Sequence, residues 1–197
     1  MMVRRIAQVL SVAVVATVAG CGVSPTARFY TLDSTAAPDG TAAVSYAIAV
    51  GPVSVPPCVD RPQFVVQVAP NQVAFDEFNR WAAPLDDGVA RAVAGDLGVL
   101  LGTTRVGTGP LPGFDPAYRV TIDVQRFESN PGEGVLVDAV WAVHAAASGR
   151  TQGGRTLARE AVQGKDFDAL AAAHSRALAK VSSDIASAIR AQAGQRR

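Results

Sequence analysis

The first twenty-one residues constrain the chain most, because they separate a targeting segment from the part that folds. Arg4 and Arg5 supply a short positive start, and residues 6–18 follow as an almost uninterrupted apolar run of about 13 residues. A secretory signal core has about 7–15 such residues, whereas a membrane-spanning helix needs roughly 20. The sequence therefore predicts that this segment directs export and takes no part in the folded domain.

Small residues and a cysteine end this segment. The stretch Val18-Ala19-Gly20-Cys21 resembles the bacterial lipobox, in which the cysteine thiol receives a diacylglycerol, the signal is removed and the new amine is acylated. Residues 1–20 are then a lipoprotein signal peptide, and the mature protein begins at Cys21 with palmitate-type acyl chains. Because each buried methylene adds roughly 0.8 kcal/mol, more than one chain anchors firmly. We expect Cys21 to be the lipid attachment site.

Two other interpretations of this segment stay open. An ordinary signal peptide cut near Ala19 would release a soluble exported protein, and an uncleaved helix would hold the chain by its apolar run. Gly20, Gly22 and Pro25 argue against the helix, since such residues end helices. Gly22 also stands where an aspartate signals inner-membrane retention in enterobacterial lipoproteins. The lipidated form is therefore expected in the outer membrane, facing the periplasm.

Composition bounds the rest of the chain. Removing 20 of the 197 residues leaves 177, a length suited to one domain. Two of the 18 basic residues lie in the signal, which leaves 16 against 17 acidic ones, and no basic block supports binding to nucleic acid. With Cys21 lipidated, Cys58 is the one remaining cysteine, so no internal disulfide is expected. We interpret Cys58 as a buried residue that packs as a small hydrophobe; the alternative is a reactive nucleophile.

The amino-terminal half shows strand patterns followed by one helix. Residues 21–43 read as a lipidated segment and tether, with a short strand or extended piece at 28–32 and a flexible connection at 33–43. Strands are expected at 46–55, with an edge position or bulge at Gly51-Pro52, and in a hairpin at 63–69 and 73–75. Phe78 and Trp81 are expected to cover part of the core.

A helix is expected between Pro84 and Gly102. Proline is tolerated at the first helical position, carboxylates in the first turn complement the helix dipole, and glycine ends helices well. Asp86 and Asp87 are therefore interpreted as helix-terminus residues rather than as an acid–base pair. A short strand is expected at 103–106.

The carboxyl-terminal half predicts an antiparallel meander and a long helix. Alternation at 118–125 and 135–143, with a third strand at 155–162, indicates three sequential strands joined by turns at 128–134 and 148–154. Asp138 and His144 are expected on the face opposite the apolar one. The helix runs from Asp166 or Asp168 to about residue 193 and carries one apolar stripe, composed of Leu170, His174, Leu178, Val181, Ile185 and Ile189.

The predicted fold is α/β: a single domain over residues 44–193, with a mixed, mostly antiparallel sheet, two main packed helices and a disordered tail at 194–197. His174 and His144 have no spacing relation that favours a metal site, and His174 is interpreted as a core histidine. The sequence contains no recognisable nucleophile–base pair, phosphate loop or ligand cluster. We therefore expect no enzymatic activity, no cofactor and no metal.

Several short pieces, taken in order, are similar to one known family. They are Cys21 followed by residues 28–32 (RFYTL), residues 50–53 (VGPV) with Pro56, residues 60–63 (DRPQ), and residues 80–85 (RWAAPL). Their order resembles the PqiC-type ABC transport auxiliary lipoproteins over essentially the whole chain. One departure is that Cys58 and Val59 stand where a tyrosine and a leucine often precede the Asp-Arg-Pro.

The resemblance implies a fold similar to anticodon-binding-like domains and the amino-terminal part of TolB. It also implies an outer-membrane lipoprotein that works beside an MCE-domain (mammalian cell entry) protein and ABC transporter components, in a system that moves lipids or maintains the envelope. A homo-oligomeric ring is compatible with such a subunit, although no residue pattern requires it. The family brings no catalytic residues, so Cys21 alone is carried over. The alternative function is a periplasmic lipid-binding carrier, with an acyl chain held between sheet and helix.

Overall fold

The computed structural model describes residues 25–109, 113–164 and 166–195. Their elements follow the predicted order of strands, helix, antiparallel meander and helix. Neither of the two helices in these ranges combines the length and apolar character that crossing a membrane requires. The elements are β1 (Arg28–Tyr30), β2 (Ile48–Ser54), β3 (Gln63–Ala69), β4 (Gln72–Trp81), α2 (Leu85–Leu101), β5 (Val106–Gly107), β6 (Tyr118–Asn130), β7 (Gly134–Ala145), β8 (Thr151–Ala161) and α3 (Phe167–Gly194).

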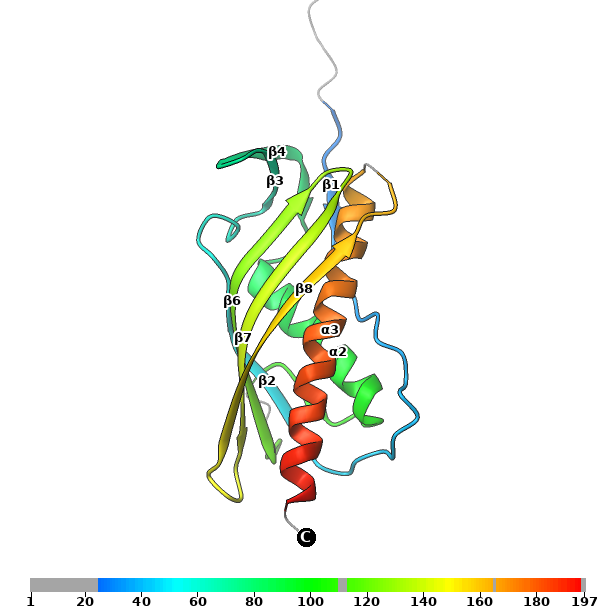
Figure 1. Ribbon diagram of the computed structural model, residues 1–197, viewed down its shortest axis with the longest axis vertical. Coiled ribbons are helices and arrows are strands. Elements are labelled where there is room, and N and C mark those ends of the chain that lie inside the picture. The colour runs from blue at the N-terminus through cyan, green and yellow to red at the C-terminus, as the bar shows by residue number, and fades with distance from the viewer. Residues whose placement is uncertain (1–24, 110–112, 165, 196–197) are drawn as a thin grey trace, which may run out of the picture.

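The strands form two sheets. Five strands in the order β5-β2-β6-β7-β8 make the larger sheet, and three in the order β1-β4-β3 make the smaller one. The helices α2 and α3 pack against each other, and together they cover one face of the larger sheet (Figure 1). The predicted mixed α/β domain with two helices is confirmed. The single sheet expected from the sequence is instead two sheets. β1 and β3 pair with both edges of β4, so β4 has no edge left to pair with the larger sheet.

Bulges explain where the strands differ from their predicted lengths. The register of β6 on β7 shifts between Val124 and Arg126, which returns Phe127 and Ser129 to the buried face and lets β6 continue to Asn130. The turn expected at 128–134 is therefore shorter, at 131–133, and the turn expected at 148–154 lies at 146–150 because β8 begins earlier, at Thr151. In β2 the register shifts between Val50 and Val53, which confirms the bulge expected at Gly51-Pro52.

Both helices begin and end close to the predicted residues. Pro84 precedes α2, and Gly102 ends it in the left-handed conformation with φ of 60°, which glycine adopts without steric cost. The side chain of Asp166 accepts a hydrogen bond from the backbone N–H of Ala169 at the start of α3. The whole predicted apolar stripe of α3 is buried, at 0–1% exposure.

Residues 33–43 form no helix or strand, but they do not match the flexible connection predicted for them. The buried carboxylate of Asp96, on α2, holds this segment. Its Oδ1 accepts hydrogen bonds from the hydroxyl of Ser34 and from the backbone N–H groups of Thr35 and Ala36, at 2.8–2.9 Å. Its Oδ2 accepts one from the hydroxyl of Ser182 on α3, at 3.0 Å. One side chain thus joins the amino-terminal segment to both helices.

Replacing Asp96 by Ala is expected to lower the free energy of unfolding by about 3 kcal/mol, because buried donors lose a charged acceptor. Urea denaturation followed by tryptophan fluorescence measures this loss, and limited proteolysis should cut the released segment sooner. Asp87→Ala is the matched control, since this exposed carboxylate of the same helix contributes at most about 1 kcal/mol through the helix dipole. Equal losses in the two variants would contradict the role given to Asp96.

His174 lies at the centre of the core, as expected for a stripe residue. It is fully buried, its ring stacks on Phe127 with centroids 3.8 Å apart, and Phe64 and Trp81 lie within 6.4 Å. Its Nε2 and the hydroxyl of Ser129 are 2.8 Å apart, while Nδ1 has no hydrogen-bond partner among the described residues. Burial lowers the pKa of His174 to about 3, so the ring is neutral.

The free energy of unfolding is expected to fall as the pH decreases from 6.5 towards 3, because the unfolded chain then binds a proton that folded His174 does not. Protonation of this one histidine can change the free energy of unfolding by at most about 1.4 kcal/mol per pH unit. Urea denaturation at pH 7, 6 and 5 measures it. His174→Gln should flatten the dependence, whereas His144→Gln, at an exposed position, should keep it; identical slopes in all three proteins would refute this explanation.

Candidate functional site

Three separated pieces of the sequence meet where β4 ends. β1 pairs in parallel with β4, so that Tyr30 lies beside Trp81. The backbone N–H of Trp81 donates to the carbonyl oxygen of Pro62 at 2.7 Å, and that of Ala82 donates to the carbonyl oxygen of Tyr30 at 2.9 Å. Residues 28–32, 60–63 and 80–85, which carry the resemblance noted in the sequence, are therefore neighbours in space.

A surface groove of about 330 Å³ opens at this junction. Two prolines and two alanines dominate its lining, and Asp60 and Arg61 are its charged members. Because proline has no N–H and alanine has no polar side chain, the walls offer few hydrogen bonds and suit an apolar group of a partner. The groove is lined by Asp60, Arg61, Pro62, Trp81, Ala82, Ala83 and Pro84.

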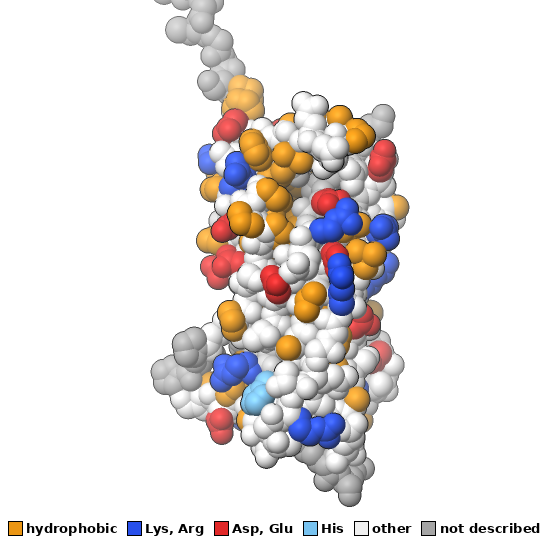
Figure 2. Space-filling view, turned by 60° about the vertical axis from the view of Figure 1, so that its left-hand side comes forward, with side chains coloured by type: hydrophobic (Ala, Val, Ile, Leu, Met, Phe, Trp, Pro, Cys, Tyr) orange, Lys and Arg blue, Asp and Glu red, His pale blue; other side chains and the backbone are white. Residues whose placement is uncertain are grey.

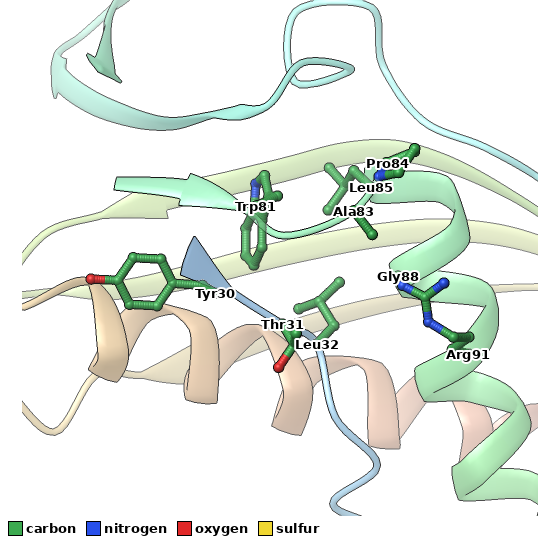
Figure 3. A pocket seen from close by; sticks show the side chains of 9 residues that line it. All are labelled: Tyr30, Thr31, Leu32, Trp81, Ala83, Pro84, Leu85, Gly88 and Arg91. Atoms are coloured by element: carbon green, nitrogen blue, oxygen red, sulfur yellow. The ribbon is translucent and has the colours of Figure 1, made fainter. Parts of the chain in front are cut away.

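Aromatic packing holds the floor of the groove. Trp81 is 7% exposed, and its ring stacks on Phe64 with centroids 4.3 Å apart. On the other side of Trp81, β1 and the start of α2 leave a gap of only about 10 Å³, lined by Leu32 and Leu85, while the Tyr30 ring points away from these two side chains (Figure 3). The guanidinium of Arg61 lies 4.1 Å from the ring centre of Phe75, a cation–π contact that orients one wall. The groove is thus preformed.

The predicted attachment residue, Cys21, lies outside the described residues. Three residues separate it from Pro25, where the description begins. Its lipidation stays a prediction. The site that the structure does describe lies just downstream, because β1 begins at Arg28 and already contacts the groove-forming strand.

Two side chains predicted to be internal are exposed instead. Cys58 is exposed, because the turn in which Val59 and Asp60 donate backbone hydrogen bonds to the carbonyl of Pro56 points Val59 inward, at 5% exposure. Phe78 is 42% exposed because it lies in a bulge of β4. In this bulge the backbone N–H of Phe78 donates a hydrogen bond to the carboxylate of Asp76. Trp81 covers the core as expected.

The other residues considered for chemistry are not brought together. His144 lies on the exposed face of β7 and contacts the hydroxyl of Thr151, whereas Asp138 on that strand is paired with Arg155. Arg155 holds the pKa of the Asp138 carboxyl below its usual value. Asp86 and Asp87 lie in the first turn of α2, as predicted. Within the described ranges, no three His, Cys, Asp or Glu residues are grouped so that they could hold a metal ion.

Sequence reasoning missed Asp96 and the groove. The importance of Asp96 could have been recognised from the sequence, because this carboxylate interrupts the buried face of the helix formed by Val93, Leu97 and Leu100. A lone carboxylate on an apolar helix face requires a partner when the helix packs. The groove had no local signal, since its two walls are about twenty residues apart in the chain.

Comparison with known structures supports the fold. The chain superposes on the crystal structure of an uncharacterized protein with a TM-score of 0.69 and 21% identity, covering 84% of this chain and 99% of that one. It superposes on protein XCC0632 from Xanthomonas campestris, of the family DUF330, with a TM-score of 0.71 and 20% identity, covering 87% of this chain and 100% of that one. Comparison with curated protein sequences gives no match.

Comparison with protein families identifies the chain. Residues 30–186 match the family described as the ABC-type transport auxiliary lipoprotein component. The match begins in β1 and ends within α3, so it includes the groove, both sheets and the helices that cover the larger sheet. The family's description implies a transport-associated lipoprotein located in the cell envelope. The chain belongs to the family of ABC-type transport auxiliary lipoprotein components.

Proposed function

We propose that this protein is a PqiC-type subunit, anchored through lipid on Cys21 to the outer membrane and facing the periplasm. Its domain docks an MCE-domain protein of an ABC transport system that moves lipids or maintains the envelope. The observation that carries the proposal is the preformed groove at the junction of β1 and β4, close in sequence to the lipobox. The family match supports the transport role.

The groove suits docking because its geometry is fixed before a partner arrives. Backbone hydrogen bonds join Pro62, Trp81, Ala82 and Tyr30, and the stacked rings of Trp81 and Phe64 lie beneath them. A rigid apolar depression costs little ordering entropy when a partner side chain enters it. The lipid anchor keeps the domain at one membrane surface, which raises its effective concentration for a partner there.

We propose that the protein acts without catalysis. The contact between Ser129 and His174 has the spacing of a nucleophile and its base, but the two side chains are 3% and 0% exposed. No acceptor orients Nδ1 of His174 among the described residues, whereas a catalytic dyad needs both an orienting group and access for substrate. The contact therefore satisfies buried polar groups.

The alternative role as a lipid carrier has less support. Val137 on β7 and Leu178, Val181 and Ile185 on α3 are fully buried, so side chains fill the layer in which an acyl chain would lie. Native mass spectrometry after gentle extraction separates the two roles. A carrier would retain non-covalent lipid, and a docking subunit is expected to retain none.

Replacing Cys21 by Ala should release the protein from the outer membrane, because the change removes the sulfur that carries the acyl chains. Membrane fractionation and immunoblotting measure the distribution. Cys58→Ala is the matched control and should stay in the membrane fraction, since Cys58 is an exposed thiol outside the lipobox. Retention of the Cys21→Ala protein in the outer membrane would contradict the anchor.

Replacing Ala82 by Glu should reduce crosslinking to the MCE-domain partner by about tenfold or more, because an unpaired charge would enter the apolar groove. The exposed side chain of Ala82 can change without loss of its backbone bond to Tyr30. Ala146→Glu is the control: Ala146, just after β7, is also exposed, and its backbone N–H donates to the carbonyl oxygen of Ala117, just before β6. Equal crosslinking in both variants would place the partner elsewhere.

A further inference from the structure

The first part of the β3–β4 hairpin is unusual for an exposed structure because it lacks charge. Residues 62–75, PQFVVQVAPNQVAF, contain no Asp, Glu, Lys or Arg. The charged residues of β4, Asp76, Glu77 and Arg80, follow it, and the guanidinium of Arg61 lies over the Phe75 ring. β3 forms an edge of the smaller sheet, and exposed edge strands in soluble proteins commonly carry charged residues that prevent association. Five large apolar side chains in and beside this hairpin, here called the apolar end, are exposed: Phe29 64%, Val68 54%, Val73 45%, Phe75 46% and Phe78 42%.

Three of these side chains share one face of the smaller sheet. Val65 pairs with Phe75 and Gln67 pairs with Val73, on the face opposite Phe64. Val65 on this face is itself buried, at 9% exposure, whereas its neighbours on β4, Phe75 and Val73, are exposed. Across the β4 bulge, Gln63 pairs with Arg80, which in turn pairs with Phe29. Phe29, Val73 and Phe75 therefore share one face with Val65 and Arg80, and their exposed fractions show that all three reach solvent.

The apolar end lies where the chain enters the domain. Pro25, Thr26 and Arg28 line one surface hollow together with Phe78, and the carboxylates of Asp76 and Asp166 lie in the same hollow. In Figure 1 the β3–β4 hairpin and β1, near which the described chain begins, lie at one end of the long axis, and the carboxyl terminus lies at the opposite end. Figure 2 shows hydrophobic side chains gathered over this same end.

The distance from the lipid is limited by the chain itself. Four Cα–Cα steps separate Cys21 from Pro25, which is at most about 15 Å whatever their conformation. A folded domain of 100 residues has a radius of gyration of about 13 Å and is therefore thicker than this gap. The bilayer surface is the occupant that such a short connection brings to the apolar end.

We infer that the apolar end is a membrane-contacting surface, which inserts Phe29, Val73 and Phe75 among the headgroups of the leaflet that holds the anchor. The inference rests on the proposed lipidation of Cys21. Contact is limited to the interfacial region, because the unpaired backbone groups of the β3 edge need water. The lipid holds the domain at the membrane, and the apolar end fixes its orientation, so that the groove faces a constant direction.

The test uses the full lipidated protein with Cys58→Ser, in which an introduced cysteine is the one free thiol. Val73→Cys is labelled with the fluorophore NBD, and the protein is reconstituted into vesicles of phosphatidylethanolamine and phosphatidylglycerol. Leu157→Cys on β8 is the matched control, because Leu157 is also a large apolar residue, 49% exposed, on the other sheet. Phe29→Cys is a second probe on the same face as Val73, in case the first variant fails to fold.

Nitroxides on the lipid acyl chains should quench the label at 73 and at 29 at least about twofold more than at 157, with a blue-shifted emission. If the protein floats with the vesicles but all three labels are quenched equally, the inference is wrong and the anchor stands. A blue shift that needs no vesicles and rises with protein concentration would assign the surface to a second copy and overturn the inference. Failure to float would refute the anchor, and with it the inference.

Discussion

The parallel pairing of β1 with β4 is the contact on which the rest of the molecule depends. It joins the segment that follows the proposed lipid attachment site to the strand that ends in Trp81, and so fixes that segment to the domain. The carboxylate of Asp96 then fixes the next residues of the same segment against both helices. Strand pairing and hydrogen bonds therefore fix residues 28–36 relative to the groove beside Trp81.

This arrangement gives the two parts of the protein different tasks. The larger sheet and its helices form a closed core in which even the one buried histidine is neutral and packed between aromatic rings. The smaller sheet carries the features that face outward, namely the groove beside Trp81 and the apolar end. A stable scaffold with its outward-facing features on a peripheral sheet fits the docking role proposed for this transport-associated lipoprotein.

The elements with strong local signals were predictable from the sequence. The stripe of α3, Pro84 and Gly102 at the ends of α2, and the alternation of β6 and β7 all reflect periodicity and backbone preference, which act within a few residues. The division into two sheets was not predictable, because alternation shows which residues face inward but not which strand lies beside them. Asp96, exposed Cys58 and the groove likewise depend on contacts between segments distant in the chain.

The central claim is that acyl chains on Cys21 hold an otherwise unreactive domain at a bilayer, and intact mass measurement of the native protein tests it most directly. The account predicts a chain that begins at Cys21 and carries the added mass of a diacylglycerol and an amide-linked acyl group. A chain with an unmodified amino terminus and no acyl mass would contradict it. The protein would then be an exported α/β domain whose groove and apolar end serve some other partner.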